Sequence, residues 1–316
     1  MTRQAHELEV FLRGQVGTVV YGLDDVIHAL TIALIGAGHV LLEGPPGLGK
    51  TLLSNTFARV LGGEFKRIQG TADLMPTDLT GVHVFDSQRG QFVFRRGPLF
   101  ADVVLVDEVN RAGPKTQSAL LEAMEERYVT VDGERFPLPA DFLIVATQNP
   151  RDFEGTYPLP ESQLDRFMVC VQMGYPGRAD ETRIIAEYGL PRARDSSAVE
   201  TLPRGALAAA RAELAGVHLS DALVGYVLDI VAATRQSSTV GLGLSSRAAL
   251  ALARCARIEA ALRGGDFVVP DDVKRVAPWV MPHRLVLAPD AVLEGASARA
   301  EVERILAAVA VPRDAS

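Results

Sequence analysis

The chain has 316 residues, of which 48% are hydrophobic, and its formal net charge is −7. This length allows one large domain or two modest ones, and the acidic balance argues against general nucleic-acid binding. The opening residues, MTRQAHE, are too polar for a signal peptide, and the longest apolar stretch, Ala29 to Gly38, is too short to span a bilayer. We therefore expect a cytoplasmic protein without an integral membrane segment.

The cysteines and histidines do not indicate a structural metal site. Cys170 and Cys255 lack metal-ligand spacing, and the six histidines are scattered along the chain. We expect both cysteines to be reduced residues that pack in the interior.

A glycine-rich run lies between the apolar run Val40–Leu42, which predicts a buried strand, and residues 52–59, which predict a helix. It fits the P-loop pattern G-x-x-x-x-G-K-[ST] with Gly44, Pro45, Pro46, Gly47, Leu48, Gly49, Lys50 and Thr51, and Leu52 follows. The glycines let backbone N–H groups curl around phosphate oxygens at a helix N-terminus. We expect Lys50 to reach the β- and γ-phosphates and Thr51 to ligate Mg²⁺. The alternative is a glycine-rich turn that binds no ligand.

Other short apolar runs predict the rest of a sheet. They are Phe65–Gln69, Val103–Val106, Phe142–Ala146 and Phe167–Gln172, and each has the composition of a strand buried on both faces. Residues 119–127 have helical spacing. This alternation predicts an α/β fold, a parallel sheet flanked by helices.

Two of these strands end in polar residues that suit ATP hydrolysis. Hydrolysis needs one group that holds Mg²⁺ and another that polarises water. Asp107 and Glu108, directly after Val103–Val106, are predicted to take these two roles, with Glu108 as general base. Asn149, after the next strand, is placed to contact the γ-phosphate or the attacking water. The alternatives are a solvated acidic turn and a turn asparagine before proline.

The pattern changes near Tyr175-Pro176-Gly177, where strand signals stop and alanine-rich helical patterns begin. Ser220 and Pro270 mark two helix starts, and residues 192–201 are predicted to form a loop. We therefore expect an α/β domain over residues 1–176 and a smaller all-helical domain over residues 177–316.

Residues 71–91 and 128–136 lie outside the minimal α/β pattern and are predicted hairpins. The first contains two alternating runs around a turn at residues 86–90. The second has Asp132-Gly133 between two alternating runs, which is a strong hairpin signal.

Several strings carry a family resemblance. Besides the P-loop they are GHVLLEG at 38–44, LMPTDLTG at 74–81, DEVNRA at 107–112, AMEER at 123–127, EGTYPLPESQLDRF at 154–167, SSRA at 245–248 and PDDV at 270–273. Over nearly its whole length the chain resembles the AAA+ ATPases, specifically the MoxR family. The resemblance makes the helical domain a lid and implies that both hairpins lie near the pore of a ring, where they contact substrate; the alternative is packed decoration.

The resemblance also implies roles for single residues. Asn149 matches the sensor-one position, and Arg166 matches the arginine finger that reaches a neighbouring subunit's nucleotide. The alternative for Asp165-Arg166 is a local surface ion pair. Arg247 matches sensor two, although Ser246 stands where a proline is common, and whether Arg247 acts within its own subunit or on a neighbour stays open. Val20 and Tyr21, expected just before the first helix, match a segment that packs against adenine.

The implied function is Mg²⁺-dependent ATP hydrolysis by a ring, with six subunits expected, that remodels or matures a protein complex. ATP and Mg²⁺ are the implied cofactors, and a von Willebrand factor A domain protein and a protein client are the implied partners. One alternative is a nucleic-acid motor, which the acidic charge disfavours. Another is a nucleotide-dependent scaffold with little hydrolysis, which the complete set of predicted catalytic residues disfavours.

Overall fold

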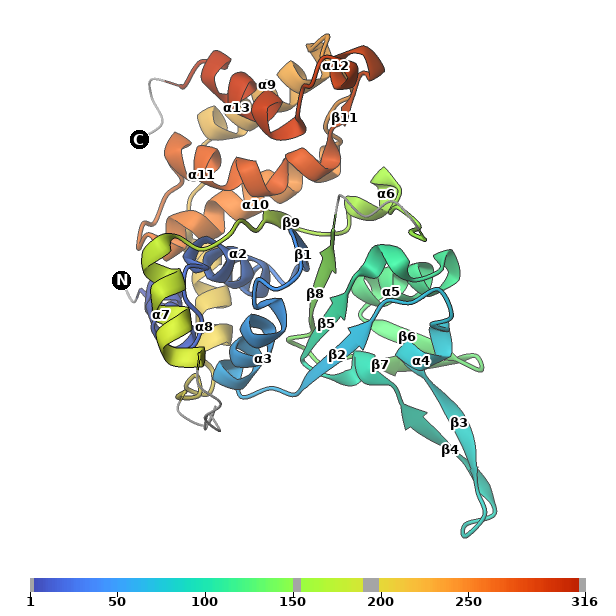
Figure 1. Ribbon diagram of the computed structural model, residues 1–316. Coiled ribbons are helices and arrows are strands. Elements are labelled where there is room, and N and C mark those ends of the chain that lie inside the picture. The colour runs from blue at the N-terminus through green and yellow to red at the C-terminus, as the bar shows by residue number, and fades with distance from the viewer. Residues whose placement is uncertain (1–2, 150–154, 190–198, 313–316) are drawn as a thin grey trace.

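The computed structural model describes residues 3–149, 155–189 and 199–312 (Figure 1). Five parallel strands form its central sheet in the order β2-β5-β8-β1-β9. Their bounds are β1 Val40–Glu43, β2 Phe65–Gln69, β5 Val103–Asp107, β8 Leu143–Gln148 and β9 Val169–Gln172. All five predicted strands are confirmed, and the strand that leads into the P-loop lies between β8 and β9.

Helices cover both faces of this sheet, and successive strand residues point alternately into the two hydrophobic cores that lie between the sheet and these helices. Leu42, Leu105 and Val145 belong to a core shared with α1 (Gln4–Gly17), α2 (Asp24–Ile35) and α3 (Lys50–Leu61). Leu41, Val104 and Ile144 belong to a second core shared with α5 (Pro114–Glu126). This period of two is expected of strands covered on both sides and confirms the α/β prediction.

Both predicted hairpins form. The short helix α4 (Pro76–Thr80) leads into β3 (Gly81–Asp86) and β4 (Gln91–Arg96), which project away from the body of the molecule (Figure 1). The second hairpin pairs β6 (Tyr128–Val131) with β7 (Glu134–Pro137). Asp132 and Gly133 have φ of 51° and 84°, as the two central residues of a type I′ turn require.

The C-terminal half is a helical lid, as predicted. Ser220 caps α9, Ser245 caps α10, and α11 begins at Pro270. The short strands β10 and β11, which form an antiparallel ribbon, were not predicted. The elements from residue 178 onward are α7 Arg178–Tyr188, α8 Ala206–Glu213, η4 Leu214–Gly216, α9 Asp221–Gln236, β10 Val240–Leu242, α10 Ser246–Leu262, α11 Pro270–Val280, η5 Pro282–Arg284, β11 Val286–Leu287, α12 Pro289–Leu293 and α13 Ala298–Ala308.

Val20 and Tyr21 do not precede the first helix, because α1 comes before them and buries Leu8, Leu12 and Val16 at helical spacing. Most of the predicted loop at residues 192–201 lies outside the described residues. The remaining short elements are η1 Pro98–Phe100, η2 Val109–Arg111 and α6 Glu161–Leu164.

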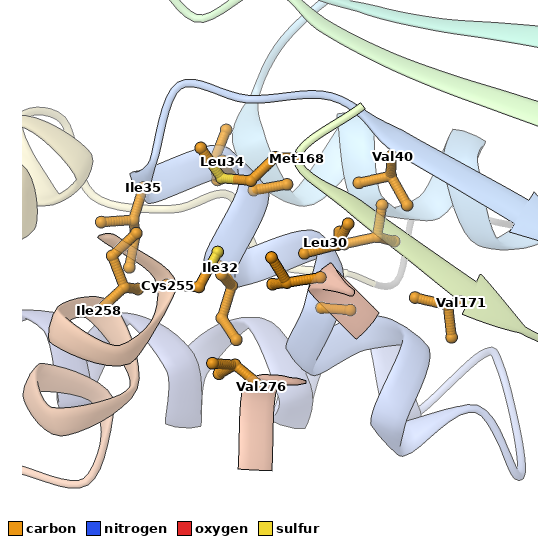
Figure 2. Close-up of a cluster of buried hydrophobic side chains, with 14 of the residues drawn as sticks. Leu30, Ile32, Leu34, Ile35, Val40, Met168, Val171, Cys255, Ile258 and Val276 are labelled. Carbon is orange, nitrogen blue, oxygen red and sulfur yellow. The ribbon is translucent and has the colours of Figure 1, made fainter. Parts of the chain in front are cut away.

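Helix α2 packs between the sheet and the lid. Figure 2 shows Ile32 and Ile35 of α2 beside Cys255 and Ile258 of α10, and Val276 of α11 lies nearby. Cys255 and Cys170 are both buried and free, as expected. The core domain and the lid therefore share one hydrophobic core. Among the described residues, no helix has the length and apolar character needed to cross a membrane.

Candidate active site

The P-loop joins the carboxyl end of β1 to the first turn of α3. Gly47 and Gly49 have φ of 85° and 77°, which a residue with a side chain rarely adopts, so the loop needs glycine at both positions. The Lys50 Nζ atom donates a hydrogen bond to the Gly44 carbonyl oxygen at 2.7 Å. In this conformation the lysine side chain reaches back to the first residue of the loop.

The P-loop, the acidic strand end and the predicted sensor share one cavity of about 490 Å³. Its walls include Lys50, Thr51, Asp107, Glu108 and Asn149, so the P-loop that follows β1 and the carboxyl ends of β5 and β8 meet at one edge of the sheet. The other predicted loop residues on the wall are Gly44, Pro46, Gly47, Leu48, Gly49 and Leu52. Pro45 belongs to the loop but is not on the wall.

Lys50 lies near enough to Asp107 and Glu108 for their charges to act on its pKa. Burial lowers the pKa of Lys50, and the nearby charges of Asp107 and Glu108 act in the opposite direction. A cation held beside two carboxylates at a helix N-terminus suits the binding of polyphosphate with its counter-ion.

Thr147 organises the acidic pair, a role that the sequence did not reveal. Its hydroxyl donates a hydrogen bond to Asp107 Oδ1 at 2.7 Å and accepts one from the Glu108 backbone N–H at 2.9 Å. The side chain is 1% exposed. A threonine directly after the apolar run Leu143–Ala146 was the only signal in the sequence.

Three further side chains hold the carboxylates, and none was predicted. Arg67 donates to Asp107 Oδ2 at 2.7 Å. Gln69 donates to Glu108 Oε2 at 3.1 Å, and Arg111 pairs with the same oxygen at 3.1 Å. Glu108 also has a left-handed backbone, with φ of 53°. Strain of this kind is sustained only where surrounding contacts fix the residue, as they often do at functional sites.

The donor set fits Mg²⁺ and a nucleotide. Magnesium prefers oxygen ligands, and the Thr51 hydroxyl and the Asp107 carboxylate are both on the cavity wall. A second cavity of about 430 Å³ adjoins the first and shares Gly47 to Gly49 and Leu52 with it. Val20, Tyr21 and Tyr188 line this mostly apolar cavity, which suits a planar base.

Arg166 and Arg247 lie elsewhere. Both pair with Glu125 of α5, Arg166 with Oε2 at 3.1 Å and Arg247 with Oε1 at 3.0 Å. Their cavity, of about 290 Å³, also includes residues 37–39, which precede β1, whereas the P-loop follows β1. Because the strands are parallel, the two arginines are at the amino edge of the sheet and the P-loop is at the carboxyl edge.

A P-loop, an acidic strand end and a polar sensor on a parallel sheet beneath a helical lid define an ATPase of the AAA+ class. The sequence profile of the ATPase family associated with various cellular activities (AAA) matches residues 39–169, and that of the AAA lid domain matches residues 232–305. The chain is 42% identical to the chaperone MoxR1 of Mycobacterium tuberculosis, covering 99% of this chain and 84% of the relative. The chain therefore belongs to the MoxR family of AAA+ ATPases.

Two further proteins are similar to this one over nearly the whole chain. The uncharacterized protein YeaC of Bacillus subtilis is 43% identical over 94% of this chain and 92% of its own length. A crystal structure from Cytophaga hutchinsonii, described as that of a candidate ATPase, superposes with a TM-score of 0.89. It is 38% identical and covers 98% of this chain and 95% of that one.

Proposed function

We propose that this protein is a Mg²⁺-dependent ATPase that assembles into a ring, with six subunits expected, and uses ATP hydrolysis to remodel another protein. The observation that carries the proposal is the meeting of Lys50, Thr51, Asp107, Glu108 and Asn149 on the wall of one cavity. Each supplies a function that phosphoryl transfer to water requires.

The proposed chemistry assigns one task to each side chain. Lys50 binds the β- and γ-phosphates, and Glu108 accepts a proton from the attacking water while Asn149 orients the reacting groups. Thr51 and Asp107 would hold Mg²⁺, which neutralises phosphate charge when bound. Glu108 must first exchange its contacts with Gln69 and Arg111 for the water.

We propose that Arg166 and Arg247 both act on the nucleotide of a neighbouring subunit. Their place at the amino edge of the sheet, opposite the P-loop, supports this for Arg166 and favours the same choice for Arg247. A guanidinium is always charged and offers planar donors, so it stabilises charge that develops on the γ-phosphate. Hydrolysis would then require assembly.

A protein client is the proposed substrate of the motor. The β3–β4 hairpin supports this because it presents Phe85 and Phe92, which are 56% and 69% exposed, at a distance from the ATP site. The chaperone name of the relative MoxR1 also supports it. The von Willebrand factor A domain partner, the cytoplasmic location and the boundary near residue 176 remain predictions.

The test is a pair of substitutions that separate binding from turnover. Lys50→Ala should greatly weaken binding of a fluorescent ATP analogue, because it removes the charge that faces the phosphates. Glu108→Gln should bind the analogue normally and release phosphate at least about a hundredfold more slowly, since an amide cannot accept the proton. Glu294→Gln, an exposed acid of the lid, is the matched control.

Two results would contradict the proposal. Normal phosphate release by Glu108→Gln would remove Glu108 from the mechanism. Absence of ATP-dependent phosphate release by the assembled wild-type protein with Mg²⁺ would overturn the ATPase assignment.

A further inference from the structure

The segment that carries Arg166 is held in place by the lid. Arg284, at the end of η5, is 7% exposed, and its guanidinium points at residues 165–168 of the core domain. It donates to Asp165 Oδ1 at 2.6 Å and to the Phe167 carbonyl oxygen at 2.7 Å. Longer bonds of 3.3 Å reach the carbonyl oxygens of Asp165 and Met168.

These contacts use the full donor capacity of the side chain. A guanidinium has five N–H groups, and the fifth bond of Arg284 goes to the Val280 carbonyl oxygen within the lid. Four of the five bonds therefore hold the segment on either side of Arg166. A buried charge is tolerated when it is paired and fully hydrogen-bonded, and here Asp165 provides the opposite charge.

Other lid residues hold the same segment. The His283 Nε2 atom lies 3.1 Å from the Phe167 carbonyl oxygen, so two consecutive lid residues bind that peptide group. Arg247, at the start of α10, approaches Asp165 at 3.9 Å and shares Glu125 with Arg166. Three lid residues thus hold the segment of Arg166 or share an ion-pair partner with it, although Arg166 belongs to the core domain.

We infer that Arg284 is a positioning residue for Arg166, fixing its segment to the lid so that Arg166 and Arg247 approach the neighbouring nucleotide as one unit. The inference deepens the proposed function and rests on it, because it requires that Arg166 acts in trans. Arg284 itself is buried, and its five hydrogen bonds all go to Asp165, Phe167, Met168 and Val280. Its contribution to hydrolysis passes through the geometry of Arg166.

A second buried contact between lid and core provides a matched control. Glu259 of α10 pairs with His28 of α2 and is 5% exposed. Its partners are His28 and Arg275, and no bond joins it to residues 165–168. Loss of this contact would loosen the lid without releasing the segment that carries Arg166.

The experiment compares Arg284→Met, Arg284→Lys and Glu259→Gln in the full-length assembled protein. Arg284→Met should lower kcat roughly tenfold to hundredfold, because small misplacement of a catalytic group costs that much. Affinity of the same subunit for a fluorescent ATP analogue should stay within about twofold. Arg284→Lys keeps the ion pair with Asp165 but loses the planar set of guanidinium donors, so its kcat should lie between those of Arg284→Met and wild type. Glu259→Gln should lower the melting temperature and leave kcat near wild type.

A double substitution tests whether the effect passes through Arg166. The protein with both Arg284→Met and Arg166→Ala should hydrolyse ATP no more slowly than Arg166→Ala alone. If Arg284→Met does not fold, Arg284→Lys takes its place in the same comparison. Additive losses, or an equal loss of kcat in Glu259→Gln, would show that Arg284 only attaches the lid and would overturn the inference.

The outcomes also separate this inference from the proposed function. Normal turnover in a folded Arg284→Met protein, together with poor turnover in Arg166→Ala, would overturn the positioning role alone. Normal turnover in Arg166→Ala would remove the trans-acting arginine and the positioning role together.

Discussion

At the residue scale, the hydroxyl of Thr147 is the contact on which the acidic pair depends. It is a donor to the Asp107 carboxylate and an acceptor for the Glu108 N–H in a site that excludes water from the threonine. Loss of this one oxygen would leave two polar groups without a partner, and a buried polar group that loses its partner costs roughly 1–3 kcal/mol.

We predict that Thr147→Val lowers kcat by about tenfold or more, because valine keeps the shape and removes both hydrogen bonds. Nucleotide affinity should change little, since the bonds of Thr147 go to Asp107 and Glu108 and the P-loop is intact. Steady-state phosphate release and binding of a fluorescent ATP analogue measure the two quantities. Thr147→Ser, which keeps the hydroxyl, is the control, and equal turnover in the valine and serine variants would contradict the role.

The sequence predicted the P-loop, Asp107, Glu108 and Asn149 because each lies in a local pattern. It did not predict Thr147, Gln69 or Arg67, because their roles follow from the strand order β2-β5-β8. Strands adjacent in this sheet are separated in the chain by long connections, so no spacing rule links these side chains. The pairing of Arg166 and Arg247 through Glu125 was not predicted either, because it depends on how the lid helix α10 packs against α5.

At the scale of elements, the two hairpins support each other through aromatic rings. Phe94 of β4 stacks on Phe136 of β7 with ring centroids 4.1 Å apart, and His83 of β3 pairs with Asp132. Farther along the first hairpin, the rings of Phe85 and Phe92 contact each other, with centroids 5.4 Å apart, but both side chains are exposed. One aromatic pair therefore joins the hairpins, and the other is available for contact.

We predict that Phe94→Ala speeds backbone amide exchange in residues 81–96 roughly fivefold or more, because it removes a stacking contact of about 1 kcal/mol. Phe92→Ala removes an exposed ring from the same strand and should leave exchange near the base of the hairpin unchanged. Hydrogen exchange followed by mass spectrometry makes the comparison. Equal exchange rates in the two variants would contradict the inference that Phe94 stabilises the hairpin and Phe92 does not.

The hairpins were predictable because their turn chemistry is local, with Asp132 and Gly133 both in the left-handed region that the turn requires. The ribbon of β10 and β11 was not predictable, since strands of three and two residues are too short for an alternating pattern. Phe136, in the second of the hairpins that were expected to contact substrate, packs against Phe94, a partner that only the tertiary structure supplies.

At the scale of the whole molecule, buried charge joins the core domain to the lid. His28 of α2 lies between Glu9 of α1 and Glu259 of α10, and Arg275 of α11 pairs with Glu259 at 2.9 Å. Burial alone would lower the pKa of His28, but hydrogen bonds and charge from Glu259 and Glu9 outweigh it and raise the pKa to about 9.

This shift predicts a pH dependence of stability. A histidine with a raised pKa in the folded state contributes stability that is fully present below about pH 6.5, its unfolded pKa, and is lost as the pH rises through about 9. At about 1.4 kcal/mol per pKa unit, the free energy of unfolding should fall by roughly 3 kcal/mol over this range. Urea unfolding at several pH values measures it. In His28→Gln this fall in the free energy of unfolding should disappear. Identical pH profiles for wild type and His28→Gln would contradict the prediction.

The last prediction concerns assembly. If Arg166 completes the site of a neighbour, Arg166→Ala protein should bind ATP and hydrolyse it poorly, and so should Glu108→Gln protein. Mixed in equal amounts, the two should recover activity where an intact Glu108 meets an intact Arg166. Random mixing gives about one such interface in four, which sets the upper limit of recovery relative to wild type.

The control is Arg166→Ala mixed with a protein that carries both Arg166→Ala and Glu108→Gln. This mixture contains intact Glu108 but no intact Arg166, so it should not recover. Subunit exchange, followed by fluorescence energy transfer between labelled chains, must be shown in both mixtures. Recovery confined to the first mixture would support action in trans. Co-assembly without recovery would instead assign Arg166 to its own subunit, at odds with its place on the sheet edge opposite the P-loop.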